Sequence, residues 1–182
     1  MDPTNTARVA LAICSPTATV RIAARVASSR VALTVEKEGG YAGPDGQVIS
    51  LLQEFLNAKY SIDNAYRSFA DRVRGPWRDA LVDHWQEHAK EERSAAYDIA
   101  MKIVGLGADP MVTVTSVPQC PGNLDAFCQV LAKMELDTIE NGRKLIAMSG
   151  DNAAMKVFAE NLVLVDTKHL DDLRRMSQMS VG

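Results

Sequence analysis

The sequence has no apolar run long enough to cross a membrane and no excess of positive charge. A membrane-spanning helix needs about 18 apolar residues in a row, and the long apolar stretches here are broken by charged residues. The chain carries 20 Lys and Arg against 23 Asp and Glu, so it offers no basic surface for nucleic acid. We therefore expect neither a membrane span nor a nucleic-acid partner.

Cysteine is also scarce. The three cysteines, Cys14, Cys120 and Cys128, are an odd number and show no Cys-x-x-Cys spacing. This pattern favours small apolar side chains in a reducing compartment over a disulfide framework, and a cytoplasmic location is expected. The 182 residues, of which 47% are hydrophobic, are enough for one domain with its own core.

Residues 1–46 differ in composition from the rest of the chain. They carry four arginines but only one acidic residue, Asp2, before Glu36. An Arg-rich, Ser-rich and acid-poor extension is typical of an organelle transit peptide, which would direct the protein to a mitochondrion or plastid. The alternative is a docking arm or a pair of strands, because RIAARVA and RVALTVE contain many β-branched residues. The glycines and the proline of 36–46 then indicate a linker.

From residue 48 onward, apolar residues recur at three- and four-residue steps, as in amphipathic helices. Pro76 is a favoured first-turn residue and Asn123 a favoured N-cap. The boundaries expected for four helices are Val48 to about Arg74, Pro76 to the GLGADP stop, Leu124 to Ser149 and Ala153 to Met179. The sixteen residues MVTVTSVPQCPGNLDA have no helical period and are long for a connection between helices.

These features predict an all-α fold in which residues 47–179 form a four-helix bundle. The long connection has to cross the length of the bundle, so that the second and third helices run parallel. Bundles of this kind hold di-iron centres when a Glu from each of two helices and a Glu-x-x-His pair from each of the other two point inward. Three residues turn a helix by about 300°, which keeps both members of a pair on one face.

Candidate ligands lie on three of the four expected helices. They are Glu92 on the second, Glu135 on the third, and the pair Asp166-x-x-His169 on the fourth. Ala95 stands where the second helix should carry the histidine of its pair, and Lys59 stands at the matching position of the first helix. Without a metal ion, the same acidic and histidine side chains would form a buried polar network.

Residues 46–176 resemble a bacterioferritin or a related ferritin-like di-iron protein in four strings, which occur in the family's order and at its spacings: NAKYSIDNAY, HAKEERSAAYD with GLGADP, LAKMELDTIENGRKLIAMS and DTKHLDDL. The resemblance implies a ferritin-like bundle that binds one or two iron ions. It also implies Fe(II) oxidation of the ferroxidase type, if the site is active, and iron storage or detoxification. The haem-binding methionine of the family falls at Arg93, so that haem is not implied.

Measured against this family, the di-iron site is remodelled. Lys59 and Ala95 remove two ligands of one half-site, and the residues that the other half-site keeps are Glu92, Glu135, Asp166 and His169. An ammonium between Glu92 and Glu135 would neutralise buried carboxylates in place of the lost cation. The alternative is that Lys59 points outward.

Two further residues complete the candidate site. His88 lies one helical turn before Glu92 on the same face and could supply an additional imidazole to the metal. Tyr66 resembles the family's tyrosine beside the metal site. We expect it to be either a core residue or a redox relay in catalysis.

Two functions follow from these features. The first is an iron-handling protein with a half-occupied site, and the alternative is a catalytically degenerate bundle that serves as a structural subunit of a larger assembly. Thirteen residues follow His169, which is too few for the fifth helix that bacterioferritins place around a fourfold axis. The resemblance therefore favours a smaller homo-oligomer, such as a dimer or a twelve-subunit shell, or a subunit of a larger complex.

Overall fold

The computed structural model describes residues 21–27, 30–36, 44–76 and 78–179 of the chain. The chain divides into two compact units, residues 1–46 and residues 47–182. In the first unit, β1 (Arg21–Ala27) and β2 (Arg30–Glu36) pair antiparallel, with Arg21 opposite Glu36. A strand pair was one of the alternatives that the sequence allowed here, whereas the roles of a transit peptide or docking arm stay predictions.

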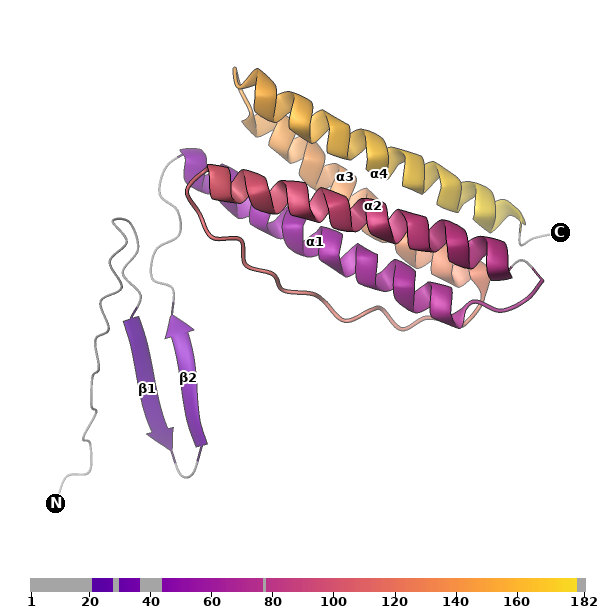
Figure 1. Cartoon of the computed structure of the whole chain (residues 1–182), viewed down its shortest axis with the longest axis horizontal. Coiled ribbons are helices and arrows are strands. Elements are labelled where there is room, and N and C mark those ends of the chain that lie inside the picture. The colour runs from indigo at the N-terminus through magenta and orange to yellow at the C-terminus, as the bar shows by residue number, and fades with distance from the viewer. Residues whose placement is uncertain (1–20, 28–29, 37–43, 77, 180–182) are drawn as a thin grey trace. The chain divides into compact units, whose positions relative to one another are not determined.

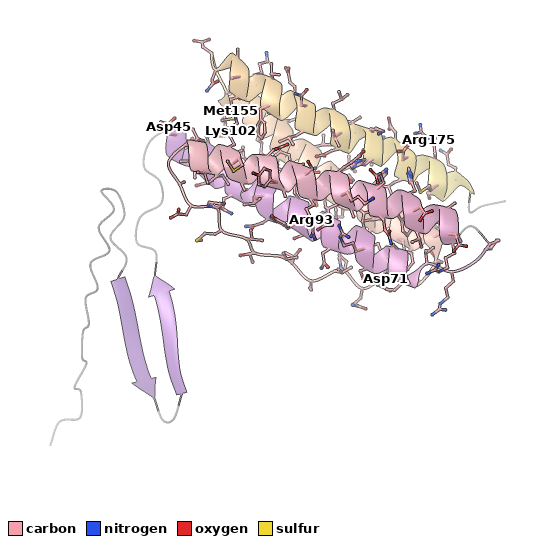
Figure 2. All side chains as sticks on the ribbon, viewed as in Figure 1. Asp45, Asp71, Arg93, Lys102, Met155 and Arg175 are labelled. Atoms are coloured by element: carbon pink, nitrogen blue, oxygen red, sulfur yellow. The ribbon has the colours of Figure 1, made fainter. Side chains whose placement is uncertain are left out.

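The second unit is the predicted four-helix bundle (Figure 1). The helices are α1 (Pro44–Arg72), α2 (Arg78–Gly105), α3 (Leu124–Met148) and α4 (Ala153–Met179). Figure 1 shows the α2–α3 connection running back beside α1 to the other end of the bundle, so that α2 and α3 run parallel. In Figure 2, Lys102 and Met155 lie near the end where α1 begins, and Asp71 and Arg175 lie toward the opposite end. This topology confirms the ferritin-like fold.

The helix ends follow local backbone chemistry. Asn123 caps α3 as predicted, because its side chain accepts a hydrogen bond of 2.8 Å from the N–H of Ala126. The predicted start of the second helix at Pro76 is wrong by two residues. Gly75, at a φ of 109°, forms a turn in which its carbonyl accepts from the N–H of Arg78 at 3.2 Å. Glycine allows this left-handed conformation, and the helix begins only after the turn.

The long connection between α2 and α3 is fastened to α1 by side-chain hydrogen bonds. The pairs are Gln53 with Met111, Asn57 with Thr113 at 2.8 Å, and Ser61 with Thr115 at 3.0 Å. The bonded residues are four apart on α1 and two apart on the connection. Four residues of helix rise about 6 Å and two residues of extended chain span about 6.6 Å, so successive bonds are spaced alike on both segments. An extended segment with no helical period can therefore follow a straight helix while its N–H groups stay bonded.

The core of the bundle is continuous between the helices, and its fully buried large side chains include Tyr66, Phe69, Trp85, Phe127 and Leu131. Helices α3 and α4 approach closely at Gly142, where an added Cβ would collide with the side chain of Val163. Among the described residues, no helix is both long and apolar enough to cross a membrane.

Candidate metal centre

Six polar side chains from four helices meet in the centre of the bundle without solvent access. They are Lys59 and Tyr66 of α1, Glu92 of α2, Glu135 of α3, and Asp166 and His169 of α4, each 0% exposed. Lys59 and Tyr66 are seven residues apart, which is about two helical turns, so they share one face of α1. Asp166 and His169 are three residues apart, which is nearly one turn, so they share one face of α4. The helical period that predicted the core therefore also places these groups inside it.

Lys59 lies between carboxylates of two other helices. Its Nζ is 2.8 Å from Oε2 of Glu92 and also forms an ion pair with Oδ1 of Asp166. Burial by itself would lower the pKa of Lys59, but the negative charges of Glu92 and Asp166 outweigh it and raise the pKa well above its usual value. The lysine is thus a fixed cation inside the core.

The position of Lys59 differs in one respect from the sequence-based expectation. We expected its ammonium between Glu92 and Glu135, and instead the second contact is Asp166. The alternative of an outward-pointing side chain is contradicted by its 0% exposure. Burial raises the pKa of Asp166, and Lys59 opposes that shift, so this carboxylate depends on the lysine for its charge.

His169 faces two carboxylates with one ring nitrogen and a third carboxylate with the other. Its Nδ1 lies 3.0 Å from Oε1 of Glu92 and 3.3 Å from Oε1 of Glu135, and its Nε2 lies 2.6 Å from Oε2 of Glu91. Burial alone would lower the pKa of His169, but the carboxylates of Glu135 and Glu92 raise it to about 10. Burial likewise opposes ionisation of Glu92, and the charge of Lys59 prevails and lowers the pKa of that carboxyl.

Glu135 is held from one side by Tyr66. The tyrosine hydroxyl donates a hydrogen bond of 2.8 Å to Oε1 of Glu135. Burial and the negative charge of Glu92 raise the pKa of Glu135 to about 7, whereas burial and the charge of Glu135 raise the pKa of Tyr66. Tyr66 therefore stays protonated and acts as a hydrogen-bond donor that orients the carboxylate.

Two carboxylate oxygens of this cluster, Oε2 of Glu135 and Oδ2 of Asp166, make no hydrogen bond within the described part of the chain. The remaining ligand atoms lie in ion pairs, because Oε2 of Glu92 faces Lys59 and Oε1 of Glu92 faces Nδ1 of His169. Ligand atoms from Glu92, Glu135 and His169 lie within 4.8 Å of one another. Buried polar atoms normally have partners, and carboxylate oxygens with one imidazole nitrogen are a donor set for iron. One metal ion therefore fits this side of the cluster.

A second ion does not fit the other side. Lys59 places a positive charge against Glu92 and Asp166, where a second metal ion would need the same oxygens. Ala95 is 9% exposed and offers no ligand atom. Both the charge and the missing imidazole oppose a paired metal centre of the kind that the Glu-x-x-His pattern builds.

His88 lies beside this cluster and turns toward a different carboxylate. Its ring stacks on that of His169, with centroids 4.1 Å apart and planes 21° apart, but its Nε2 faces Oδ2 of Asp172 at 3.5 Å. Burial and the neighbouring histidines, His169 first, lower the pKa of His88 to about 4. The imidazole that we expected near Glu92 is therefore neutral and grouped with His84 and Asp172.

Three residues at the site, Glu91, His84 and Asp172, were not predicted as site residues from the sequence. Two of them could have been identified from their helical spacing, because His84 is four residues before His88 and Asp172 is three residues after His169. Each spacing places the pair on one helix face. Glu91 carried no such signal, since it lies about 100° around α2 from Glu92 and reaches His169 from the partly exposed rim of the cluster.

The fold and this carboxylate- and histidine-lined core define a ferritin-like four-helix bundle. The chain belongs to the ferritin-like domain family, which it matches over residues 49–179. No curated protein sequence shows significant similarity to the chain.

Three solved structures illustrate the similarity in fold. A ferritin-like diiron-carboxylate protein from Bacillus anthracis aligns with a TM-score of 0.71 and 23% identity over 75% of this chain and 99% of that chain. A dodecameric thioferritin, the bacterioferritin-related protein from Bacteroides fragilis, aligns at 0.70 and 18% over 75% and 88%. Dps from Thermosynechococcus elongatus aligns at 0.66 and 16% over 72% and 90%. At these identities the similarity shows the fold alone.

Proposed function

We propose that this ferritin-like protein binds one iron ion in the centre of its bundle, with the ammonium of Lys59 in place of a second ion. The observation that carries this proposal is that buried ligand atoms of Glu92, Glu135 and His169 lie within 4.8 Å of one another, beside an oxygen of Glu135 that makes no hydrogen bond. An iron ion there would give that oxygen a partner. It would also balance carboxylate charge that the lysine alone leaves uncompensated.

The chain's own residues prepare this site before any ion arrives. Tyr66 orients Glu135, and Glu91 accepts a hydrogen bond from Nε2 of His169 whenever that nitrogen carries the proton, which leaves Nδ1 as the ligand atom. Lys59 holds Glu92 and Asp166 in place. An Fe(II) ion held by these residues would pass one electron to dioxygen and remain as Fe(III). We infer slow oxidation and retention of iron, which serve iron storage or detoxification.

Binding of iron at this site is tested with one buried carboxylate and one exposed control. Wild-type protein is equilibrated with Fe(II) without oxygen, and bound iron per chain is counted. Glu135→Gln should lose one bound ion, because an amide is a poor replacement for the carboxylate. Glu140→Gln, at an exposed position five residues further along α3, should keep it. Exposure to air should then give ferric absorbance faster than buffer with wild type and at the buffer rate with Glu135→Gln.

A catalytically degenerate structural subunit is the second candidate, and the ion pairs of Lys59 favour it. With Lys59 and His169 both protonated, the core holds two positive charges against three carboxylates, one of which has a pKa raised to about 7. The metal-free core is therefore close to neutral at that pH. If Glu135→Gln binds as much iron per chain as wild type does, the result supports this candidate and contradicts the first.

We also propose that the chain forms a homo-oligomer. Large apolar side chains at i, i+4 and i+7 on α2 are about half exposed or more, namely Tyr97, Met101 and Val104, and this helix face would be covered by a second copy. The dodecamer of the Bacteroides fragilis protein supports the idea of a shell. Sedimentation of wild type against Met101→Glu should show the assembly dissociating, and a monomeric wild type would contradict it. The location of the protein, cytoplasmic or organellar, stays a prediction.

A further inference from the structure

A second group of metal-ligating side chains lies one aromatic ring away from the core cluster. His84 and His88 of α2 are four residues apart and share a helix face, and Asp172 of α4 lies opposite them. Nε2 of His84 and Nε2 of His88 lie 3.7 Å and 3.5 Å from the same oxygen, Oδ2 of Asp172. The two imidazole rings are 4.3 Å apart between centroids.

This spacing is close to what a bound transition metal needs. An ion with ligands at about 2.1 Å in tetrahedral arrangement holds its ligand atoms roughly 3.4 Å apart. The two observed histidine-to-carboxylate distances, 3.7 Å and 3.5 Å, exceed that value by a few tenths of an ångström. Small rotations of the rings about their side-chain bonds would close this gap without moving either helix.

The hydrogen bonding of the group leaves room for such an ion. Within the described residues, Nε2 of His84, the nitrogen that faces Asp172, is buried and makes no hydrogen bond. Asp172 directs its other oxygen, Oδ1, to the guanidinium of Arg175, which lies on α4 in Figure 2. That ion pair fixes the carboxylate and leaves Oδ2 directed at the two imidazoles.

The group is also more accessible than the core cluster. The side chain of His84 is 40% exposed, that of Asp172 is 14% exposed and that of His88 is 4% exposed, whereas the core ligands are 0% exposed. Two imidazoles and one carboxylate are donors that zinc and ferrous ions accept, with further positions left for water. Hard ions such as Mg²⁺ and Ca²⁺ prefer sites made of oxygen ligands alone.

We propose that His84, His88 and Asp172 form a second metal site, which binds a divalent transition-metal ion such as Zn²⁺ or Fe²⁺. The three ligands are separate from those of the core site, so this proposal does not rest on the proposed function. The two sites adjoin through His88, whose ring stacks on His169 and meets Tyr66 edge-on at 5.3 Å between centroids.

Zinc titration of the full chain against a chromophoric chelator tests this site. Wild type should bind two Zn²⁺ ions, and His84→Ala and Asp172→Asn should each lose one of them or weaken it at least about tenfold. Asp171→Asn is the matched control, because that side chain is 53% exposed and lies near Arg174. Circular dichroism with thermal unfolding confirms that each variant is folded.

The core variant Glu135→Gln separates this proposal from the proposed function. If it loses one ion while His84→Ala loses the other, both sites exist. If wild type binds a single ion that only His84→Ala removes, the second site stands and the core proposal fails. Unchanged zinc binding in both His84→Ala and Asp172→Asn would overturn the second site, whatever happens at the core.

Discussion

The ammonium nitrogen of Lys59 lies 2.8 Å from Oε2 of Glu92, and neither side chain has any exposure to solvent. A buried carboxylate is costly unless a cation lies beside it, and in di-iron bundles that cation is the metal. Here the chain provides the cation itself. The same lysine also pairs with Asp166, so one side chain from α1 compensates charge on both α2 and α4.

Replacing Lys59 with methionine should destabilise the metal-free protein strongly. Lys59→Met keeps the volume of the side chain but removes the cation beside Asp166 and one of the two cations beside Glu92, whose other neighbour is His169. The expected loss in the free energy of unfolding is about 3–5 kcal/mol, the usual cost of removing one partner of a buried ion pair. Urea denaturation measures it. Lys133→Met is the control, since that lysine is 75% exposed and pairs only with Asp137 four residues away, and it should change stability by less than about 1 kcal/mol. Equal stability of the two variants would mean that Lys59 does not compensate the core.

Restoring both missing ligands should create room for another metal ion. The double variant Lys59→Glu with Ala95→His returns a carboxylate and an imidazole to the remodelled half-site, and it should bind one more iron ion per chain than wild type. It should also oxidise Fe(II) faster in air, because two adjacent ions can deliver two electrons together. Iron counting and ferric absorbance provide the readouts. The single variant Ala95→His keeps the lysine and should bind no more iron than wild type. A double variant that also binds no more iron than wild type would refute the assignment of this half-site.

Metal affinity at the core should rise with pH. The pKa values of His169 and Glu135 are raised to about 10 and about 7, so at pH 6 both carry protons that a metal ion has to displace. The affinity should increase about a hundredfold per pH unit below pH 7 and about tenfold per unit above it. Calorimetry in buffers of different ionisation enthalpy should count about two protons released per ion at pH 6 and about one at pH 8. Release of no protons at pH 6 would contradict this protonation state.

Removing the hydroxyl of Tyr66 should weaken the core site without abolishing it. Tyr66→Phe leaves Oε1 of Glu135 without its hydrogen-bond donor, so the carboxylate is less well oriented. Loss of such a supporting hydrogen bond typically lowers metal affinity about 10- to 100-fold. Competition with a chelator measures the change. Tyr97→Phe provides the control because that side chain is 62% exposed, and equal affinities of the two variants would show that Tyr66 is only a packing residue.

The helices and their order could be predicted from the sequence because helical periodicity is a local property. The apolar spacing, the cap at Asn123 and the long connection without helical period each depend on a few neighbouring residues. The start of α2 could not be predicted to the residue. It depended on the left-handed turn at Gly75, and glycine is compatible with many backbone conformations.

The contents of the core could be predicted, but not the contacts within it. Helix phase placed Lys59, Glu92, Glu135 and His169 on inward faces, and all four are buried. Which carboxylate receives the ammonium depends on the relative height and rotation of α1, α2 and α4, and a one-dimensional pattern does not specify these. For this reason Asp166, and not Glu135, completes the ion pairs of the lysine.

From the sequence alone, helical periodicity and the long connection predicted the four-helix bundle, and the resemblance to ferritin-like proteins implied that Lys59 and Ala95 stand at two ligand positions. Periodicity is a matter of residue type and spacing along single helices. Only the tertiary structure decided that the lysine compensates Glu92 and Asp166, and that Nε2 of His88 faces Asp172. The physical reason is that charge pairing and side-chain direction are settled between helices, where distances of a few ångströms decide the electrostatic energy.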